Sequence, residues 1–467
     1  MGPRSFLSLL VLSLCALSSD TVSARSGFAQ EFQSLLYAGR TDEAASMAQT
    51  RIATAPDDDN ARFALGAAQF LRAIEKLGQG LHRHGLQSTY QDRYGMTGLP
   101  FLRLPVPDNP NPEELTYAAI RDILASFVAE LSIAEATLGK IHAEDLDLPL
   151  NIGLIRLDLD GDGKGSEKES LWHVFKTVTG AEDWLLDGKV AEKLLTDFDA
   201  SDVPWLRAYC HLLMALAEFP LAHDWQQAFD ATFPSIFHMP GSETGRKFDE
   251  AVAVARARLA ELPSHTHTSR PSGMTWDEWR KFQSSPEYQA RMRISQRRQK
   301  YETRLGIASI ADLIAFLHLM NWPVVEPERL ANVLQHFEAV VRLSRQNWKL
   351  ILSEKDNRNE WIPSPAQTGV LPGMTVTQER VDGWQEVLGE FEHILKGTKL
   401  IPHWRFDEGI NFRRMLLEPR TFDLVLLIQG SAAVPYLEKG PIIDGARWFE
   451  ITRVFGGDSL RYFVWFN

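Results

Sequence analysis

The sequence predicts a mainly α-helical protein built from helical hairpins and bundles, with a small β-hairpin near the C-terminus. Two observations favour this fold class. Apolar residues recur at three- and four-residue steps through most of the chain, which is the period of an amphipathic helix. The length of 467 residues is about three times that of an average domain, so two or three domains are expected.

The composition excludes several classes of protein. Apolar residues make up 44% of the chain and charged residues 24%, which is typical of a globular protein and not of a disordered or collagen-like chain. The 61 acidic residues outnumber the 49 Lys and Arg residues and give a net charge of −12. Because proteins bind nucleic acids by neutralising phosphates with basic side chains, a nucleic-acid partner is not expected.

Residues 1–24 have the pattern of an export signal. Arg4 supplies positive charge, residues 6–16 form an apolar core, and Val22 and Ala24 fit the small-residue pattern of a cleavage site. The apolar run is too short to span a bilayer, so stable membrane insertion is not expected. We expect cleavage after Ala24 and a soluble protein that is exported to a periplasm or secreted.

Residues 25–86 form a first helical region, in which small residues and a proline stand at the spacing of a helical repeat. Gly39 separates two expected helices, Ala44 occupies the small position of the second helix, and Pro56 ends that helix. The segment 27–72 therefore resembles a tetratricopeptide repeat. This resemblance implies paired helices that offer a surface to a protein or peptide partner. A generic helical hairpin would explain the same residues, and this alternative stays open.

Residues 87–264 are expected to form a second helical region. After a proline-rich loop, Pro112 marks the start of a long helix. Apolar residues of this helix recur on one face: Ile120, Leu124, Phe127, Leu131, Ala134 and Leu138. A helix with one apolar face must pack that face against a neighbour, so this helix is expected in the core of the region.

The remaining chain divides into a linker and a third helical region. Residues 265–304 carry nine Lys and Arg against four acidic residues and are expected to form a basic linker helix. This helix is either a solvated connection or a surface for an acidic partner. Residues 305–467 are expected to form a helical domain. Its aromatic segments 448–455 and 460–466 flank a glycine turn and predict the terminal β-hairpin.

Residues 158–169 carry the most specific pattern in the chain. Alternating carboxylates at Asp158, Asp160 and Asp162 can converge on one cation, and Gly163 permits the sharp turn that this requires. The other expected metal ligands are the backbone carbonyl of Lys164, the hydroxyl of Ser166 and the bidentate carboxylate of Glu169. The twelve-residue segment resembles an EF-hand calcium loop, and the resemblance implies calcium as the bound ion.

Three features distinguish this segment from a paired EF-hand. Gly165 stands at position 8, where an aliphatic residue normally pairs with a second loop. The sequence contains no second loop of the same pattern. Pro149 leaves only residues 150–157 for an entering helix. We therefore expect one solitary calcium site with a structural role, and a polar turn that binds no ion remains the alternative.

The sequence favours binding over catalysis. It lacks the signatures of the common zinc proteases, serine hydrolases and P-loop nucleotidases. We expect an exported calcium-binding scaffold or interaction protein, with no catalytic residues assigned. The alternative is an exported hydrolase with a site near His403 and Asp407, because an imidazole, an indole, carboxylates and guanidiniums gather there. Salt bridges at helix ends would explain the same cluster.

Overall fold

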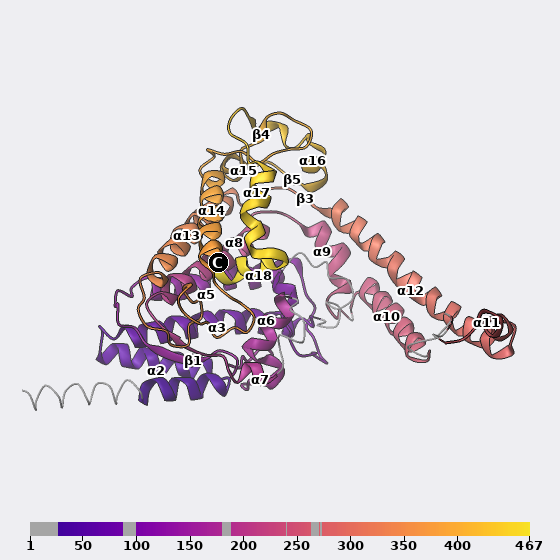
Figure 1. The fold of residues 1–467 in the computed structure, drawn as a ribbon, viewed down its shortest axis with the longest axis horizontal. Coiled ribbons are helices and arrows are strands. Elements are labelled where there is room, and N and C mark those ends of the chain that lie inside the picture. Colours follow the sequence, from indigo (N-terminus) through magenta and orange to yellow (C-terminus); the bar gives the residue numbers. More distant parts are fainter. Residues whose placement is uncertain (1–26, 87–99, 180–187, 240, 263–269, 271–272) are drawn as a thin grey trace, which may run out of the picture.

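A computed structural model describes residues 27–86, 100–179, 188–239, 241–262, 270 and 273–467. The expected export signal, residues 1–24, lies outside the described residues. The mainly α-helical fold class is confirmed: helices dominate, and the strands form small two-stranded antiparallel sheets. Figure 1 shows a helical body from which an arm projects to one side. None of the helices in the described part of the chain combines the length and apolarity needed to cross a bilayer.

The body is a series of helices in which each packs on the next. Residues 27–37 are helical, and the longer helices that follow are α2 (Thr41–Thr54), α3 (Asp59–Arg83), α5 (Tyr117–Leu138), α8 (Asp202–Leu221), α13 (Pro327–Ile351) and α14 (Gln378–Leu395). Contacts run from α2 to α3, α5, α8, α13 and α14 in that order. The N-terminal order of helices agrees with the expected layout, although α3 continues well beyond residue 72.

Helix α5 illustrates why these segments are helical. The side chain of Thr116 accepts a hydrogen bond from the backbone N–H of Ala119, 3.1 Å away, and so caps the first turn. The helix begins at Tyr117 and not at Pro112, because the cap stands at Thr116. The six residues expected on its apolar face are the six that are buried. This face packs against both α3 and α8, so α5 lies at the centre of the body.

Shorter elements join the long helices of the body, and most of them lie in the sequence between α3 and α13. They are η2 (Pro100–Arg103), β1 (Leu148–Asn151), η3 (Glu167–Glu169), α6 (Leu171–Thr179), α7 (Gly188–Ala191), β2 (Leu195–Phe198), α9 (Gln226–Thr232) and η5 (Phe233–Ser235). Strands β1 and β2 pair antiparallel, with Leu148 opposite Phe198. The side chains of both residues are buried, so this small sheet contributes to the same core as the helices.

The arm consists of α10 (Glu243–Ala260), α11 (Trp276–Gln283) and α12 (Pro286–Leu319), as Figure 1 shows. The basic linker expected at 265–304 thus corresponds, in its described part, to α11 and the first half of α12. Its charges pair along the helix: Arg291 with Glu287 at 2.7 Å and Arg298 with Glu302 at 2.6 Å. Pairs of this i,i+4 spacing support an exposed helix by a few tenths of a kcal/mol each.

The C-terminal region is helical where the sequence analysis expected strands. Its remaining elements are β3 (Asn321–Trp322), β4 (Gly409–Ile410), α15 (Phe412–Leu417), β5 (Phe422–Asp423), α16 (Leu424–Gln429), η6 (Val434–Tyr436), β6 (Leu437–Glu438), α17 (Gly445–Thr452), η7 (Arg453–Asp458) and α18 (Ser459–Phe466). Small antiparallel pairs do occur in this region, between β4 and β6 and between β3 and β5. The segments 448–455 and 460–466, however, fold as α17, η7 and α18, so the predicted position of the hairpin was wrong.

The reason for this correction is the spacing of the buried aromatic residues. In α18, Tyr462, Trp465 and Phe466 are buried and lie three and four residues apart, which places them on one face of a helix. Asp444 caps α17 by accepting a hydrogen bond from Ala446 N–H at 2.9 Å. The aromatic and β-branched composition therefore did not decide the secondary structure here, because tertiary packing overrides β-propensity.

One core joins the regions that the sequence analysis treated as separate domains. Helix α8 belongs to the expected domain 87–264 and packs along α13, which belongs to 305–467. Most of the buried apolar residues, from Phe28 to Phe466, form one connected cluster, and small separate clusters lie beside it. The last residues of α18 are fixed in this core, since the indole N–H of Trp205 donates to the carbonyl of Trp465 at 3.0 Å.

Candidate metal centre and apolar cavity

The loop at 158–169 brings three of its expected metal ligands together. Asp158, Asp160 and Asp162 each offer a carboxylate oxygen, and these oxygens lie within 4.8 Å of one another. Backbone N–H groups hold the loop in shape: Gly161 donates to Asp158 at 2.8 Å, and Lys164 donates to Asp162 at 2.8 Å. Burial, together with the charges of Asp160 and Asp162, raises the pKa of Asp158. A cation between the carboxylates would relieve this repulsion.

The other expected ligands lie differently. Glu169 is buried, and its carboxylate accepts hydrogen bonds from the backbone N–H groups of Leu159 and Ser166, both at 3.0 Å. Its two oxygens therefore close the loop through the backbone and are not grouped with the three aspartates. Lys164 and Ser166 are exposed on the loop between Asp162 and Glu169. The structure thus presents a three-carboxylate centre with further oxygen donors beside it, which is a donor set suited to calcium.

A buried carboxyl group on α3 ties the loop to the N-terminal helices. Glu75 accepts a hydrogen bond from the hydroxyl of Thr41 at 2.7 Å and from the backbone N–H of Asp158 at 3.1 Å. One turn further along α3, the side chain of Gln79 donates to the carbonyl of Asp158 at 2.8 Å. Burial raises the pKa of Glu75 to about 7. The sequence analysis missed Glu75, although an acidic residue between the apolar Leu71 and Leu77 on one helix was a signal of a buried polar contact.

The glycine at position 8 of the loop also has a structural reason. Gly165 lies against the turn at Gly39, which joins the first helix to α2; a Cβ on Gly165 would lie 3.1 Å from the Cα of Gly39. A Cβ on Gly39 would in turn overlap the backbone N of Gly165. The position that normally faces a second EF-hand loop therefore faces the N-terminal helical turn. The segment that enters the loop follows strand β1, and η3 and α6 follow the loop.

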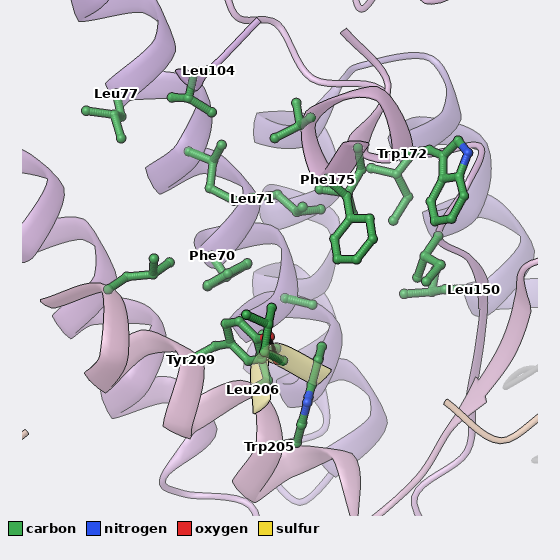
Figure 2. A pocket seen from close by; sticks show the side chains of 18 of the residues that line it. Phe70, Leu71, Leu77, Leu104, Leu150, Trp172, Phe175, Trp205, Leu206 and Tyr209 are labelled. Carbon is green, nitrogen blue, oxygen red and sulfur yellow. Dashed lines mark hydrogen bonds between the residues drawn. The ribbon is translucent and has the colours of Figure 1, made fainter. Parts of the chain in front are cut away.

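A large apolar cavity lies next to the loop, and Ile155 and Leu171, on either side of the loop in sequence, both line it. Its volume is about 320 Å³, and α3, α6 and α8 supply most of its walls. Single residues of α5, η2, β1, β2 and α18 and the side chain of Trp361 also line it. Figure 2 shows side chains from these elements around one space, with Phe70 and Leu71 from α3, Phe175 from α6 and Tyr209 from α8. None of the described residues that line it carries a charge.

The cavity is partly open to solvent, so it is a cleft between the helices and not a sealed void in the core. Covering its apolar walls with an apolar ligand would be favourable, by roughly 25 cal/mol for each Å² of apolar surface removed from water. The sequence analysis did not predict the cavity, because its walls come from residues that are up to about four hundred positions apart.

A second group of carboxyl groups lies between the N-terminal end of α8 and the segment after α13. Oxygens of Asp199, Glu354 and Glu360 lie within 4.8 Å of one another, and the buried Asp202 adjoins them. Burial, reinforced by the charge of Asp199, raises the pKa of Glu354 to about 7. Burial also raises the pKa values of Asp199, Asp202 and Glu360. These groups therefore retain protons in the folded protein at a pH where free carboxyl groups are ionised.

We expect this cluster to make stability fall with rising pH. Because the pKa of Glu354 is about 7 in the folded protein against an ordinary 4.5, the folded state binds the proton more tightly than the unfolded state. The free energy of unfolding should therefore decrease as pH rises from about 4.5 to about 7. In Glu354→Gln this loss of unfolding free energy between the two pH values should be smaller by about 1–2 kcal/mol. The figure is lower than the full pKa difference implies, because the side chain is partly exposed and solvent screens its charge.

The measurement is urea unfolding of both proteins at half-unit pH intervals. Glu328→Gln, at an exposed position of α13, is the matched control and should reproduce the wild-type profile. A parallel pH dependence in wild type and Glu354→Gln would show that Glu354 does not titrate in this range.

The residues of the alternative hydrolase site lie on the segment that precedes β4, and the described hydrogen bonds of His403 and Trp404 go to backbone groups. His403 forms a hydrogen bond with the carbonyl of Leu427 at 3.1 Å, and no hydrogen bond between His403 and Asp407 occurs in the described chain. Trp404 is exposed, and its indole N–H donates to the carbonyl of Ile428 at 2.8 Å. Arg413 pairs with Glu338 at 2.8 Å, so charges near the cluster serve surface ion pairs.

Comparisons with protein-family models, with curated proteins and with solved structures find no match to this chain.

Proposed function

We propose that this is an exported calcium-binding protein that acts as a scaffold or interaction protein, with one calcium ion held by the loop at 158–169. The observation that carries the proposal is the convergence of Asp158, Asp160 and Asp162 within 4.8 Å. Carboxylate, carbonyl and hydroxyl oxygens are the ligands that calcium prefers, and the Lys164 carbonyl, Ser166 and Glu169 would complete the set. Periplasmic or extracellular location, after loss of residues 1–24, belongs to the same proposal.

The ion has a structural role in this proposal. The loop contacts α3 through Glu75 and Gln79, and it contacts the turn at Gly39 through Gly165. It also leads through η3 directly into α6. A bound ion would therefore hold the N-terminal helices and α6 in one arrangement. The partner, a protein or peptide, would bind the outer face of these N-terminal helices, where most side chains of α2 that face away from α3 are exposed.

The test is thermal unfolding with excess chelator, with added calcium and with added magnesium. We expect the loop to bind calcium with a dissociation constant on the order of 10⁻⁴ M. A free calcium concentration about a hundred times that constant should then stabilise the protein by about 3 kcal/mol. Magnesium should stabilise it less, because it requires a tighter octahedral shell. Asp160→Asn should abolish most of the calcium effect: asparagine keeps an acceptor for the N–H of Asp162, at 3.1 Å, but lacks the charge.

Asp407→Asn is the matched control, because it makes the same chemical change at an exposed position far along the chain. This variant should respond to calcium as the wild type does. Identical melting of the wild-type protein in chelator and in calcium would mean that the loop is a polar turn without a bound ion.

A further inference from the structure

The residues that line the apolar cavity extend along two helices. Its lining residues on α3 run from Phe63 to Leu77, which corresponds to about 20 Å of helix at roughly 1.5 Å per residue. Those on α8 run from Trp205 to Ala217, a similar length. Phe127 of α5 lies between the two helices, and residues 171–175 of α6 face them. A ligand that fills this space must therefore be long and narrow.

The chemistry of the lining disfavours a charged ligand, because none of the described lining residues carries a charge. The polar side-chain groups that the lining does contain are the phenol of Tyr209 and the indoles of its tryptophans. The hydroxyl of Tyr209 donates to the carbonyl of Val464, and the N–H of Trp205 donates to the carbonyl of Trp465 at 3.0 Å. These two groups are already satisfied by the backbone, whereas the indole N–H groups of Trp172 and Trp361 are buried without a hydrogen-bond partner in the described structure. Burying a charged ligand here would cost its hydration without compensation.

We propose that this cavity binds one long hydrocarbon chain, the acyl chain of a fatty acid or of a lipid. Half the hydrocarbon thickness of a bilayer, about 15 Å, is the reach of one acyl chain, and a chain of this length fits within the lined stretch of about 20 Å. An apolar cavity of about 150 Å³ already binds benzene, and this one has about twice that volume, 320 Å³. The acid or head group stays at the open end, in contact with water. This proposal rests on the cavity alone and does not depend on bound calcium.

The test uses the full chain after removal of lipid, in the presence of chelator, so that the result is independent of the calcium site. Palmitic acid is titrated into the protein and binding is followed by calorimetry and by tryptophan fluorescence, because Trp172, Trp205 and Trp361 line the cavity. In Ala67→Phe, a ring projects from α3 into the cavity, and we expect binding to weaken about tenfold or more. The melting temperature of the ligand-free variant should not fall, since the ring fills empty space.

Two further variants locate the site. Leu213→Trp narrows the cavity from α8 and should also weaken binding, which keeps the test valid if Ala67→Phe folds poorly. Ala136→Phe makes the same change as Ala67→Phe at an exposed position of α5 and should bind palmitic acid like the wild type. Equal binding by all four proteins would overturn the assignment to this cavity.

A second experiment tests whether the hydrocarbon chain comes from a free fatty acid or from a membrane lipid. Vesicles of dipalmitoylphosphatidylcholine are incubated with the protein, separated from it, and the protein is analysed for bound lipid. Binding of palmitic acid alone identifies a fatty acid as the ligand, and uptake from vesicles identifies a lipid-borne chain. If the wild-type protein binds neither, the cavity is not an acyl-chain site.

Discussion

Phe466→Ala should lower the free energy of unfolding by about 3–5 kcal/mol, the range observed when buried phenylalanines are truncated. The side chain of Phe466 is fully buried. Its ring lies 4.6 Å from that of Trp348 on α13 and 5.9 Å from that of Trp384 on α14, both in edge-to-face contact. Truncation would open a cavity where α13, α14 and α18 meet. Urea unfolding followed by tryptophan fluorescence measures the loss.

The control for this prediction is Phe449→Ala. Phe449 lies on the neighbouring α17, but its side chain is 69% exposed, so its removal should change stability by less than about 0.5 kcal/mol. If both variants lost the same small amount, Phe466 of α18 would not be part of the buried apolar cluster.

Gly39→Ala should destabilise the protein by about 2–4 kcal/mol and weaken calcium binding at the same time. Gly39 has φ +71°, a conformation that costs an alanine about 1–2 kcal/mol. In addition, the new Cβ would overlap the backbone N of Gly165, so the loop at 158–169 would have to move. Thermal unfolding and a calcium titration of the same variant separate the two effects.

Gly373→Ala isolates the cost of the backbone conformation. Gly373 has φ +74°, close to that of Gly39, but a Cβ there would meet no atom within 4 Å. This variant should lose only about 1–2 kcal/mol and bind calcium normally. Equal losses in both variants, with unchanged calcium affinity, would show that the turn and the loop are not mechanically connected.

The helices could be predicted from the sequence where one face is buried by long, regular packing. The apolar face of α5 is the clearest case, because the period of its residues alone identifies which of them are buried. The same reasoning failed at α17 and α18. Short segments rich in aromatic residues fit either a strand or a helix, and the choice depends on neighbours such as Trp348 and Trp384, which are remote in sequence.

The candidate sites also differ in how far the sequence alone predicts them. The loop at 158–169 is encoded by consecutive residues, so its three converging aspartates were identified from spacing alone. Glu75, which accepts a hydrogen bond from the backbone of this loop, lies on α3, more than eighty residues earlier in the sequence. Neither the cavity nor the group of Asp199, Glu354 and Glu360 has a local signature, because each is assembled by the packing of α8 against distant segments.

The single core has a consequence for how the chain folds. Tyr209 and Trp205 on α8 donate hydrogen bonds to the carbonyls of Val464 and Trp465, more than 250 residues later. A growing chain therefore cannot complete this core until α18 has been synthesised, and until then the apolar faces of α8 and α13 lack part of their cover. High sequence separation between contacting residues slows folding, because the entropy of closing the intervening chain is lost before the contacts form. Refolding from denaturant should accordingly be slower than for helical bundles with local contacts, and intermediates with exposed apolar surface should accumulate.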